Sequence, residues 1–553
     1  MIDRPSAEEL LFLPLGGAGE IGMNLNLYGH AGKWLMIDLG IAFGNESTPG
    51  IDVIMPDPAF IAERREDLAG LVLTHAHEDH IGAVPYLWPR LRCPIYATPF
   101  TASVLRRKLV EAGLHLEAEI TEVPMSGRFA VGPFEIELIT LTHSIPEPNA
   151  VVVRTPLGTV LHTGDWKLDP EPLVGPNADE DALRRLGEEG VLAMVGDSTN
   201  AMVEGESGSE SEVRDSLMEL VGRFKNRVAV ACFASNVARL ETLAHVAAAH
   251  GRHLALVGRS FWHVSQAARE NGYLADLPEF VTEHDVGYLP RNAVLMACTG
   301  SQGEPRSALA RIARGEHPNV VLEKGDAVIF SSRVIPGNER AIGQLQNDLV
   351  RLGVEIVTDR EYFVHVSGHP ARDELAAMYR WIRPKIAIPV HGELRHLVEH
   401  AEFARSLQVS EAVVALNGSL VRLAPGPAEI VGEVPAGRLG LDGKALVPLN
   451  GGVLRSRHRT LRNGSAVATL VVDGEGRLLA EPQLAAQGLL DPEADQPAYD
   501  ETVAAIRAAL EDLPAAARLD DAAVKEAARL AVRRTLHAIR GKKPVTEVHL
   551  VRI

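Results

Sequence analysis

The stretch Thr74-His75-Ala76-His77-Glu78-Asp79-His80 follows directly on the apolar segment GLVL at residues 70–73. A short apolar run that ends in polar residues predicts a buried strand with the histidines just beyond its end. Four candidate ligands, His75, His77, Asp79 and His80, fall within six residues. Packed so closely, they would repel each other and lose hydration, and a divalent cation removes both costs. The stretch therefore predicts a metal site at the end of a strand.

Further candidate ligands follow three later strand-like segments. His143 stands in LTHSIPE, Asp165 in LHTGDWKLD and His391 in IPVHGE. Six or seven nitrogen and oxygen ligands are too many for one tetrahedral zinc ion and suit two adjacent metal ions. Asp38, which ends the segment KWLMID, is predicted to orient a ligand or its loop. Scattered, solvated histidines are the alternative, and the density of ligand types argues against it.

The glycines at residues 17–22 match the GxGxxG pattern of dinucleotide-binding folds. That pattern holds a pyrophosphate only when a helix follows it. Here NLNLYG alternates like a strand, and the strand-like WLMIDLG comes after it. Residues 10–42 therefore predict a β-meander, with a glycine turn rather than a nucleotide site.

The pattern of predicted secondary structure changes at about residue 211. Apolar strand-like segments then alternate with segments of helical spacing, for example RVAVACF before VARLETLAHVAAAHG. This alternation predicts a parallel, doubly wound sheet. A Pro/Gly-rich stretch from about residue 424 predicts a linker. The last hundred residues predict a small α+β unit with helices near 500–513 and 521–540, and the final thirty residues hold eight Lys/Arg against two Glu.

Composition limits the class of protein. A chain of 553 residues, 46% apolar and 23% charged, predicts three or four globular domains. Its three cysteines form no CxxC pair, which is typical of the reducing cytoplasm, where we expect the protein to reside. No apolar run approaches the ~18–20 residues of a membrane span. The net charge of −18 excludes a protein that coats nucleic acid through bulk charge, but not a nuclease with a local basic groove.

Many short segments resemble one known family. They are LGGAGEIGMN, GIDVIMPD, THAHEDHIG, THSIPE, HTGDWKLDP, GDSTN, FASN, CTGSQGEPRSAL, IPGN, HVSGHP and PVHGE. From about residue 11 to its end, the chain resembles the β-CASP nucleases of the metallo-β-lactamase superfamily, most closely the bacterial ribonuclease J family. The resemblance implies an α/β fold in which a lactamase-type αββα sandwich (1–210 and 361–430) carries an inserted, doubly wound β-CASP domain (211–360). A linker (431–455) and an α+β C-terminal domain (456–553) would follow.

The resemblance also implies how metals are bound. One ion would be held by His75, His77, His143 and Asp165, and the second by Asp79, His80 and His391, with Asp165 bridging the two. These ligands suit two Zn²⁺ ions per subunit, and Mn²⁺ would tolerate the same set. Some relatives carry a structural Ca²⁺ near a GID loop, so Gly50, Asp52 and Asp442 are candidates for it.

Cleavage of RNA needs an activated water, charge stabilisation at phosphorus and a proton for the leaving oxygen. His369 is the candidate acid, with Asp197 holding its ring. Asp79 is an alternative general base, although a metal ligand is poorly placed for that role. Helix N-termini bind phosphate, and simple helix capping is the alternative explanation for Ser235 and Asn236. By resemblance, the contacts to the RNA backbone or its 5′ phosphate come from Ser235, Asn236, His365, Ser367, Gly368 and His369.

These expectations combine into a metal-dependent ribonuclease with 5′→3′ exonuclease and some endonuclease action. It would leave 5′-phosphate products, prefer 5′-monophosphorylated single-stranded RNA, and serve bacterial RNA decay and rRNA and mRNA maturation. The family implies homodimers or homotetramers. Partners in an RNA-degrading complex are possible, and the lack of a long apolar run predicts no membrane association. The rivals are a small-molecule metallohydrolase, a catalytically inert scaffold of an RNA-degrading complex and a DNA-cutting β-CASP enzyme. The inserted domain and the HVSGH segment argue against the first, and the intact ligand set argues against the second.

Overall fold

The structure is a computed structural model that describes residues 4–553. The chain forms two compact units. The first comprises residues up to Ala42 and Ile54–Gly437, and the second comprises Phe43–Val53 and Arg438–Ile553.

The first unit contains two mixed sheets packed face to face. One sheet has the order β25 (Glu429–Glu433), β24 (Ser419–Ala424), β1 (Leu10–Gly16), β3 (Leu25–His30), β4 (Lys33–Ile37), β7 (Leu68–Val72), β8 (Ile95–Ala97), β9 (Ile120–Glu122). The other has the order β10 (Arg128–Val131), β11 (Phe134–Thr140), β12 (Asn149–Thr155), β13 (Gly158–His162), β14 (Ala193–Asp197), β21 (Ile386–Val390), β23 (Glu411–Ala412). The antiparallel run β1–β3–β4 confirms the predicted meander, and the strand β3 follows the glycine turn.

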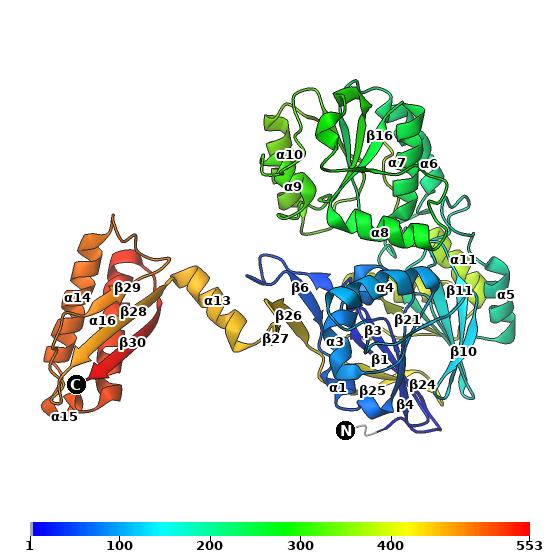
Figure 1. Cartoon of the computed structure of the whole chain (residues 1–553). Coiled ribbons are helices and arrows are strands. Elements are labelled where there is room, and N and C mark those ends of the chain that lie inside the picture. The colour runs from blue at the N-terminus through cyan, green and yellow to red at the C-terminus, as the bar shows by residue number, and fades with distance from the viewer. Residues whose placement is uncertain (1–3) are drawn as a thin grey trace. The chain divides into compact units, whose positions relative to one another are not determined.

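Apolar side chains from both sheets form the core between them. Leu35, Ile37 and Val72 of the first sheet share one buried cluster with Val151 and Val195 of the second. Helices cover the outer faces, so the sandwich has four layers. The second sheet is covered by α5 (Glu180–Glu189), α11 (Arg372–Ile382) and α12 (Leu394–Ser406), and α1 (Ala59–Ala62), α3 (Val84–Leu91) and α4 (Pro99–Glu111) lie beside the first (Figure 1).

A third sheet, in which all strands are parallel, is inserted into the sandwich between β14 and β21. Its order is β17 (Val281–Thr282), β16 (His253–Val257), β18 (Val294–Cys298), β15 (Val228–Ala231), β19 (Ala327–Phe330), β20 (Glu355–Val357). Residues of α9 (Ala308–Ala313) and α10 (Glu339–Arg351) share a buried apolar cluster with the strands of this sheet. Helices α6 (Glu210–Val221), α7 (Val237–Ala249) and α8 (Arg259–Glu270) also flank the sheet (Figure 1). The alternation of strands and helices predicted this inserted, doubly wound sheet. The chain returns to the sandwich at β21, which pairs in parallel with β14.

A buried ionic cluster joins the inserted domain to the sandwich. Lys167 lies 2.9 Å from the Asp169 carboxylate, which also accepts a hydrogen bond from the Glu210 backbone. The Glu210 carboxylate pairs with Arg239 at 2.9 Å, and Arg239 is fully buried. The Arg239 guanidinium also donates to the carbonyl of Val364, on the segment that leads back into the sandwich. The two domains of the first unit therefore share a charged, fully hydrogen-bonded junction.

The second unit begins with a hairpin and a helix. The hairpin β26 (Arg438–Asp442) and β27 (Ala445–Pro448) turns at Gly443, whose φ of 61° suits a two-residue turn. Helix α13 (Gly452–Asn463) follows. The predicted linker at 431–455 thus contains regular structure, because the glycines and prolines there mark a hairpin turn and strand ends instead of an extended connection.

A three-stranded sheet with helices on one face completes the second unit. Its order is β29 (Gln483–Ala485), β28 (Ser465–Val472), β30 (Val545–Arg552), and it carries α14 (Gln496–Glu511), α15 (Ala515–Arg518) and α16 (Asp521–Arg540). Alternate residues of β28 share a core with Ile506, Val524 and Leu536 of these helices. The helices expected near 500–513 and 521–540 correspond to α14 and α16.

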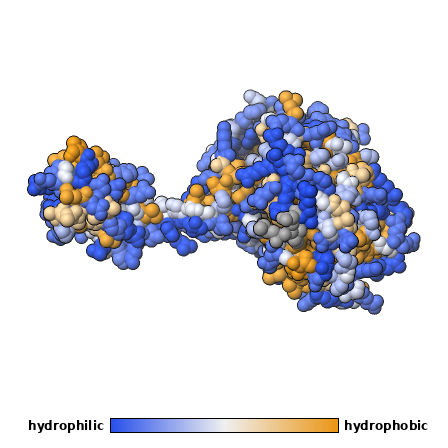
Figure 2. Space-filling view, turned by 90° about the horizontal axis from the view of Figure 1, so that it is seen from below, coloured by the Kyte–Doolittle hydropathy of each residue, from blue (hydrophilic) through white to orange (hydrophobic). Residues whose placement is uncertain are grey.

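The hydropathy of the surface and of the helices was compared with that of membrane-spanning segments. On the face shown in Figure 2, hydrophilic residues dominate both units, and hydrophobic residues appear in small groups. Within residues 4–553, no helix is both long enough and apolar enough to span a membrane.

Candidate metal centre

The predicted ligands meet at one edge of the sandwich. Each lies just beyond the end of a strand: 75–80 after β7, His143 after β11, Asp165 after β13 and His391 after β21. The short pairing of β2 (Ala18–Gly19) with β22 (Gly392–Glu393) ties the glycine turn to the residue after His391. The fold therefore brings together ligands that are separated by more than 300 residues in sequence, as the difference between 75 and 391 shows.

Three imidazole nitrogens converge in the first ligand group. His77 Nδ1 lies 3.1 Å from His75 Nε2 and 3.0 Å from His143 Nε2. Asp165 Oδ2 lies 3.9 Å from the same nitrogens of His75 and His143. A zinc ion binds imidazole nitrogens at ~2.0–2.1 Å, so nitrogens spaced this closely suit one shared ion. These four residues form a set with the spacing that a metal ion requires.

The second ligand group shares Asp165 with the first. His80 Nε2 lies 3.2 Å from Asp165 Oδ1 and 3.7 Å from Asp79 Oδ2. His391 Nε2 lies 3.6 Å from both Asp79 Oδ2 and Asp165 Oδ2. Asp165 is therefore a member of both groups and would contribute to the binding of either ion.

Two buried atoms of this centre make no hydrogen bond of good geometry: His391 Nε2, and Asp165 Oδ1, whose contact with His80 Nε2 at 3.2 Å is an ion-pair contact only. Buried polar atoms nearly always have a partner, so an orphaned carboxylate oxygen and an orphaned imidazole nitrogen call for one. Both atoms are ligand types that a divalent cation accepts. The residues therefore fit a metal cofactor.

The nitrogen that faces away from the ligand group is held in most of these imidazoles. His80 Nδ1 donates to Asp38 Oδ2 at 2.7 Å, and His391 Nδ1 donates to Asn24 Oδ1 at 3.0 Å. His75 Nδ1 donates to Thr74 Oγ1 at 2.9 Å, and His143 Nδ1 donates to the carbonyl of Gly368. Such partners fix the tautomer and aim the remaining nitrogen at the metal.

Two residues of this centre have a backbone conformation that is unusual for non-glycine residues. Asp38 has a φ of 63° and His391 a φ of 52°. The Asp38 carboxylate accepts hydrogen bonds from the backbone and hydroxyl of Thr74, each at 2.9 Å, and the backbone of His391 donates to Gly17. Strained backbone of this kind persists where the surroundings over-determine it, as in functional sites.

Electrostatics favour neutral rings in the first group. Burial lowers the pKa of His75, His143 and His77, the last to about 4, and neighbouring imidazoles lower the pKa further. Burial also acts on His80, but the carboxylates of Asp165, Asp79 and Asp38 outweigh it and raise the pKa of that ring. At neutral pH the first group therefore presents free nitrogen lone pairs, which are the form that metals bind.

His369 and Asp197 form a pair beside the ligands. His369 Nδ1 lies 2.7 Å from Asp197 Oδ2 and 3.8 Å from Asp165 Oδ2. Burial lowers the pKa of His369, but the carboxylates of Asp197 and Asp165 outweigh it and raise the pKa to about 9. Gly368 allows the close approach, since a Cβ there would lie 2.6 Å from the His143 ring. The pair is a hydrogen-bonded dyad that stands next to both ligand groups.

The predicted phosphate contacts lie on two segments of the first unit. Asn200 Nδ2 donates to Ser367 Oγ at 2.8 Å and to the carbonyl of His369 at 3.0 Å. His365 Nδ1 is buried without a partner. The Asn236 side chain caps α7 by accepting from the Arg239 backbone, and it also donates to Glu210 at 3.1 Å. Capping, the alternative explanation for Asn236, thus accounts for its side chain.

The guanidinium of Arg457 lies beside the candidate calcium residues. In the second unit, Arg457 pairs with Asp442 Oδ2 at 2.6 Å and donates to the carbonyl of Pro49 at 3.3 Å. A Cβ on Gly50 would lie 3.1 Å from the same guanidinium. Arg457 thus neutralises Asp442 in this structure, and calcium binding by Gly50, Asp52 and Asp442 stays a prediction.

Four known protein families match successive parts of the chain. They are described as "Metallo-beta-lactamase superfamily" (residues 23–200), "Ribonuclease J, beta-CASP domain" (225–349), "Zn-dependent metallo-hydrolase RNA specificity domain" (353–412) and "Ribonuclease J C-terminal domain" (452–553). A crystal structure of a protein of unknown function from Enterococcus faecalis V583 shares the fold, with a TM-score of 0.52 and 14% identity over 75% of this chain and all of that one.

Curated relatives extend the match to the whole chain. The sequence is 45% identical to "Ribonuclease J" of Sinorhizobium meliloti over 100% of this chain and 99% of the relative. The chain belongs to the ribonuclease J family. It is also 39% identical to "Ribonuclease J" of Mycobacterium tuberculosis H37Rv over 94% and 93%, and 38% identical to that of Thermus thermophilus over 83% and 81%.

Membership in the ribonuclease J family makes the protein a metal-dependent ribonuclease, a hydrolase with RNA as its substrate. Sequence reasoning missed two polar residues of its site. Asn24 holds His391, and Asn200 holds Ser367 and His369. Both lie in segments that carry the ribonuclease J resemblance, LGGAGEIGMN and GDSTN, so their signal was present without an assigned role.

Proposed function

We propose that the protein degrades RNA from its 5′ end, with some internal cleavage, and leaves 5′-phosphate products. The observation that supports this most strongly is the pair of ligand groups joined at Asp165, with the His369–Asp197 dyad beside them. We further propose that the two groups each hold a Zn²⁺ ion and that Mn²⁺ can substitute, since histidine and aspartate ligands suit both. Its role would be in bacterial RNA decay and in rRNA and mRNA maturation.

Each part of the centre has its own task. Two divalent ions bound there would lower the pKa of a water molecule and stabilise charge on the phosphate. His369 holds a proton at Nε2 for the leaving oxygen, because its Nδ1 is occupied by Asp197. Asp197 orients the ring through that hydrogen bond. Asp79 acts as a ligand rather than a base, because its carboxylate faces His80 and His391.

The 5′ phosphate is proposed to bind where the HVSGHP segment meets the start of α7. Ser367 Oγ accepts hydrogen bonds from Asn200 and from the His369 backbone, so its own proton is available to a phosphate oxygen. The partnerless His365 Nδ1 and the half-buried Ser235 lie on the same two segments. These short donors suit one compact, doubly charged phosphate. Because Gly368 has no side chain, it would let the phosphate approach the backbone closely.

Self-association is proposed to involve the C-terminal domain, as a homodimer or homotetramer. Helices cover one face of the β29–β28–β30 sheet, and its other face carries half-buried Val467 and Val471 of β28 and exposed Val551 of β30. That face offers apolar surface to a second copy. Partners in an RNA-degrading complex are a further expectation.

The test is digestion of 5′-labelled, 5′-monophosphorylated RNA with and without a chelator. Immediate release of labelled mononucleotide that stops on chelation is expected. Labelled fragments of intermediate length, without early mononucleotide, would instead indicate a purely internal cutter. The variant His391→Ala should match the chelated protein, while His253→Ala, which removes an exposed histidine of β16, should match the wild type.

A further inference from the structure

Helix α13 of the second unit is strongly basic in an acidic protein. Its sequence GVLRSRHRTLRN contains Arg455, Arg457, Arg459 and Arg462 with His458, and no acidic residue. The chain as a whole has a net charge of −18, with 73 Asp and Glu. Among the helices of ten or more residues in the described part of the chain, α13 alone has no carboxylate, so its cations need a partner from elsewhere.

The arginines divide into two sides of the helix. Arg455, Arg459 and Arg462 are spaced by four and three residues, which places them on one face of an α-helix. All three are exposed. Arg457 lies on the opposite side, where it pairs with Asp442, and Leu454 is buried against the unit. Within the described part of the chain, Arg457 is the one arginine of α13 with a carboxylate partner.

The helix thus packs through Leu454 and Arg457 and leaves a three-arginine stripe, Arg455, Arg459 and Arg462, free of carboxylates. At ~1.5 Å per residue, the stripe is about 10 Å long, which is roughly the rise of three nucleotide steps, from the first to the fourth of successive phosphates, at ~3.4 Å per step. Guanidinium groups bind phosphate through paired hydrogen bonds. A row of them on this spacing matches consecutive phosphates of one nucleic acid strand.

A lipid surface fits this helix poorly. Helices that lie on membranes bury a broad apolar face in the bilayer. On α13 the apolar side chains are Val453, Leu454 and Leu461, and Leu454 is already buried within the protein. An RNA backbone needs only the cations, and proteins that hold single strands use positively charged tracks of this kind.

We propose that the three-arginine stripe of α13 binds the phosphate backbone of RNA. It would hold a stretch of the substrate that is not engaged at the metal centre. The proposal rests on RNA being the substrate, but not on the direction of cleavage or on the 5′-phosphate pocket.

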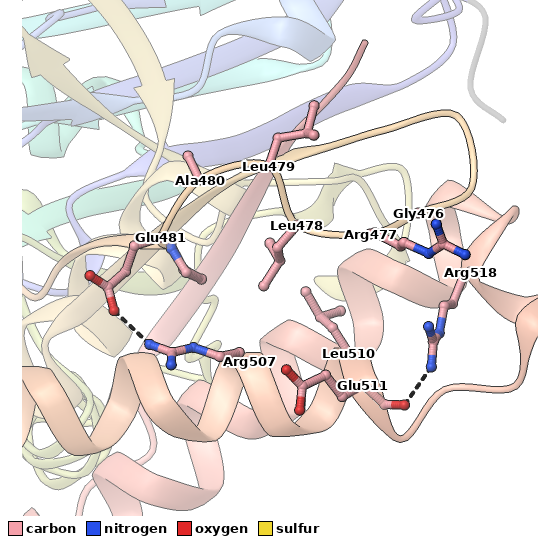
Figure 3. A pocket seen from close by; sticks show the side chains of 11 residues that line it. Gly476, Arg477, Leu478, Leu479, Ala480, Glu481, Arg507, Leu510, Glu511 and Arg518 are labelled. Carbon is pink, nitrogen blue, oxygen red and sulfur yellow. Dashed lines mark hydrogen bonds and ion pairs between the residues drawn. The ribbon is translucent and has the colours of Figure 1, made fainter.

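The same unit offers matched control arginines. Arg477 and Arg507 line a cavity of about 540 Å³ together with Leu478, Leu479 and Leu510 (Figure 3). Arg507 pairs with Glu481 at 2.6 Å across its wall, and Arg477 pairs with Glu475 at 2.7 Å. Arg529 of α16 pairs with Glu526 at 2.6 Å. Because carboxylates already occupy these three guanidiniums, their loss changes net charge equally without removing a free phosphate site.

The experiment compares two triple variants of the full chain. One is Arg455→Gln/Arg459→Gln/Arg462→Gln, and the control is Arg477→Gln/Arg507→Gln/Arg529→Gln. Binding of a labelled, unstructured 30-nucleotide RNA is measured in EDTA, so that no cleavage occurs, over a range of salt concentrations. The stripe variant should bind roughly tenfold more weakly at low salt, and its plot of log K against log salt should be shallower by about 2, at ~0.7 per lost phosphate contact.

Two further measurements separate this result from misfolding. The variant Arg455→Lys/Arg459→Lys/Arg462→Lys keeps the charge and should restore most of the salt slope. Cleavage of a tetranucleotide, too short to reach beyond the metal centre, should proceed at the wild-type rate in the stripe variant. Equal RNA affinity and salt slope for the stripe and control variants would overturn the proposal. The same result is expected if the stripe binds an acidic protein and not RNA.

Discussion

His369 Nδ1 lies 2.7 Å from Asp197 Oδ2, although the two residues are separated by the whole inserted domain. Asp197 ends β14, the strand before the insertion, and His369 lies just ahead of α11, after it. The same contact therefore joins the segments before and after the inserted domain and orients the proposed general acid.

The first prediction concerns this dyad. The variant His369→Ala should keep both metals and RNA affinity but reduce the cleavage rate by ~10²–10⁴-fold, which is the usual contribution of a general acid. Asp197→Asn should cause a similar loss, because an amide cannot hold the protonated ring. The double variant should be little worse than either single one, since the residues act as a unit. Losses that simply multiply, or loss of bound metal in His369→Ala, would show that His369 has another role.

The second prediction concerns the metal ligands. His80→Ala should abolish cleavage and lower the metal content of the purified protein, because it removes a nitrogen that faces Asp165. Asn24→Ala should reduce metal affinity by about 10–100-fold without abolishing binding, since Asn24 only orients His391. Metal content is measured by elemental analysis after dialysis. Two metals per chain and wild-type turnover in His80→Ala would refute the ligand assignment.

The third prediction concerns the buried pair Arg239–Glu210 between the two domains of the first unit. Arg239→Met leaves a buried carboxylate without its cation and should cost ~3–5 kcal/mol of unfolding free energy in a denaturant titration. Adding Glu210→Gln should recover much of that loss. The exposed pair Arg223–Glu219 supplies the control, and Arg223→Met should leave the unfolding midpoint unchanged.

The same pair predicts a pH dependence. Burial raises the pKa of Glu210, but Arg239 and Lys167 outweigh it and hold the pKa below its ordinary value. A lowered pKa in the folded state means that the pair stabilises the protein above the ordinary carboxyl pKa of ~4.3. This stability is lost as the pH falls below that value. Glu210→Gln should flatten the acid side of the stability curve, and a curve with the wild-type slope would contradict the assignment.

The fourth prediction concerns the C-terminal domain. Deleting residues 452–553 should reduce the number of subunits per assembly, as calculated from the mass that light scattering measures, because the proposed self-association surface lies in this segment. The two-metal content should persist, since every proposed ligand belongs to the first unit. A truncated protein that retains the full-length oligomeric state would contradict the assembly role.

Much of this architecture could be predicted from the sequence because its signals are local. The alternation of strands and helices after residue 211 predicts the inserted parallel sheet, and the strand after the GxGxxG segment excludes a nucleotide fold. The ligand histidines were visible because their types cluster at strand ends. The hairpin at 438–448 was hidden, since glycine and proline mark both turns and linkers.

The rest depends on contacts between distant segments. Nothing near Asn24 indicates that its amide will meet His391, because only the fold brings them together. The sequence likewise does not predict that Arg457 will contact Pro49 and Asp442, since a lone arginine on a helix is usually solvated. Asn236 shows the converse case, in which a local rule, helix capping, explains the side chain that resemblance assigned to RNA.

The most direct test of 5′-end-directed cleavage compares two RNAs of identical sequence that differ only in their 5′ group. The metal-loaded wild-type protein should release mononucleotides from the 5′-monophosphorylated RNA far faster than from the 5′-triphosphorylated RNA, because the short donors of Ser235, His365 and Ser367 suit one compact phosphate. Ser235→Ala/Ser367→Ala should lose most of that preference while internal cleavage continues. Equal mononucleotide release from both RNAs by the wild-type protein would contradict the account.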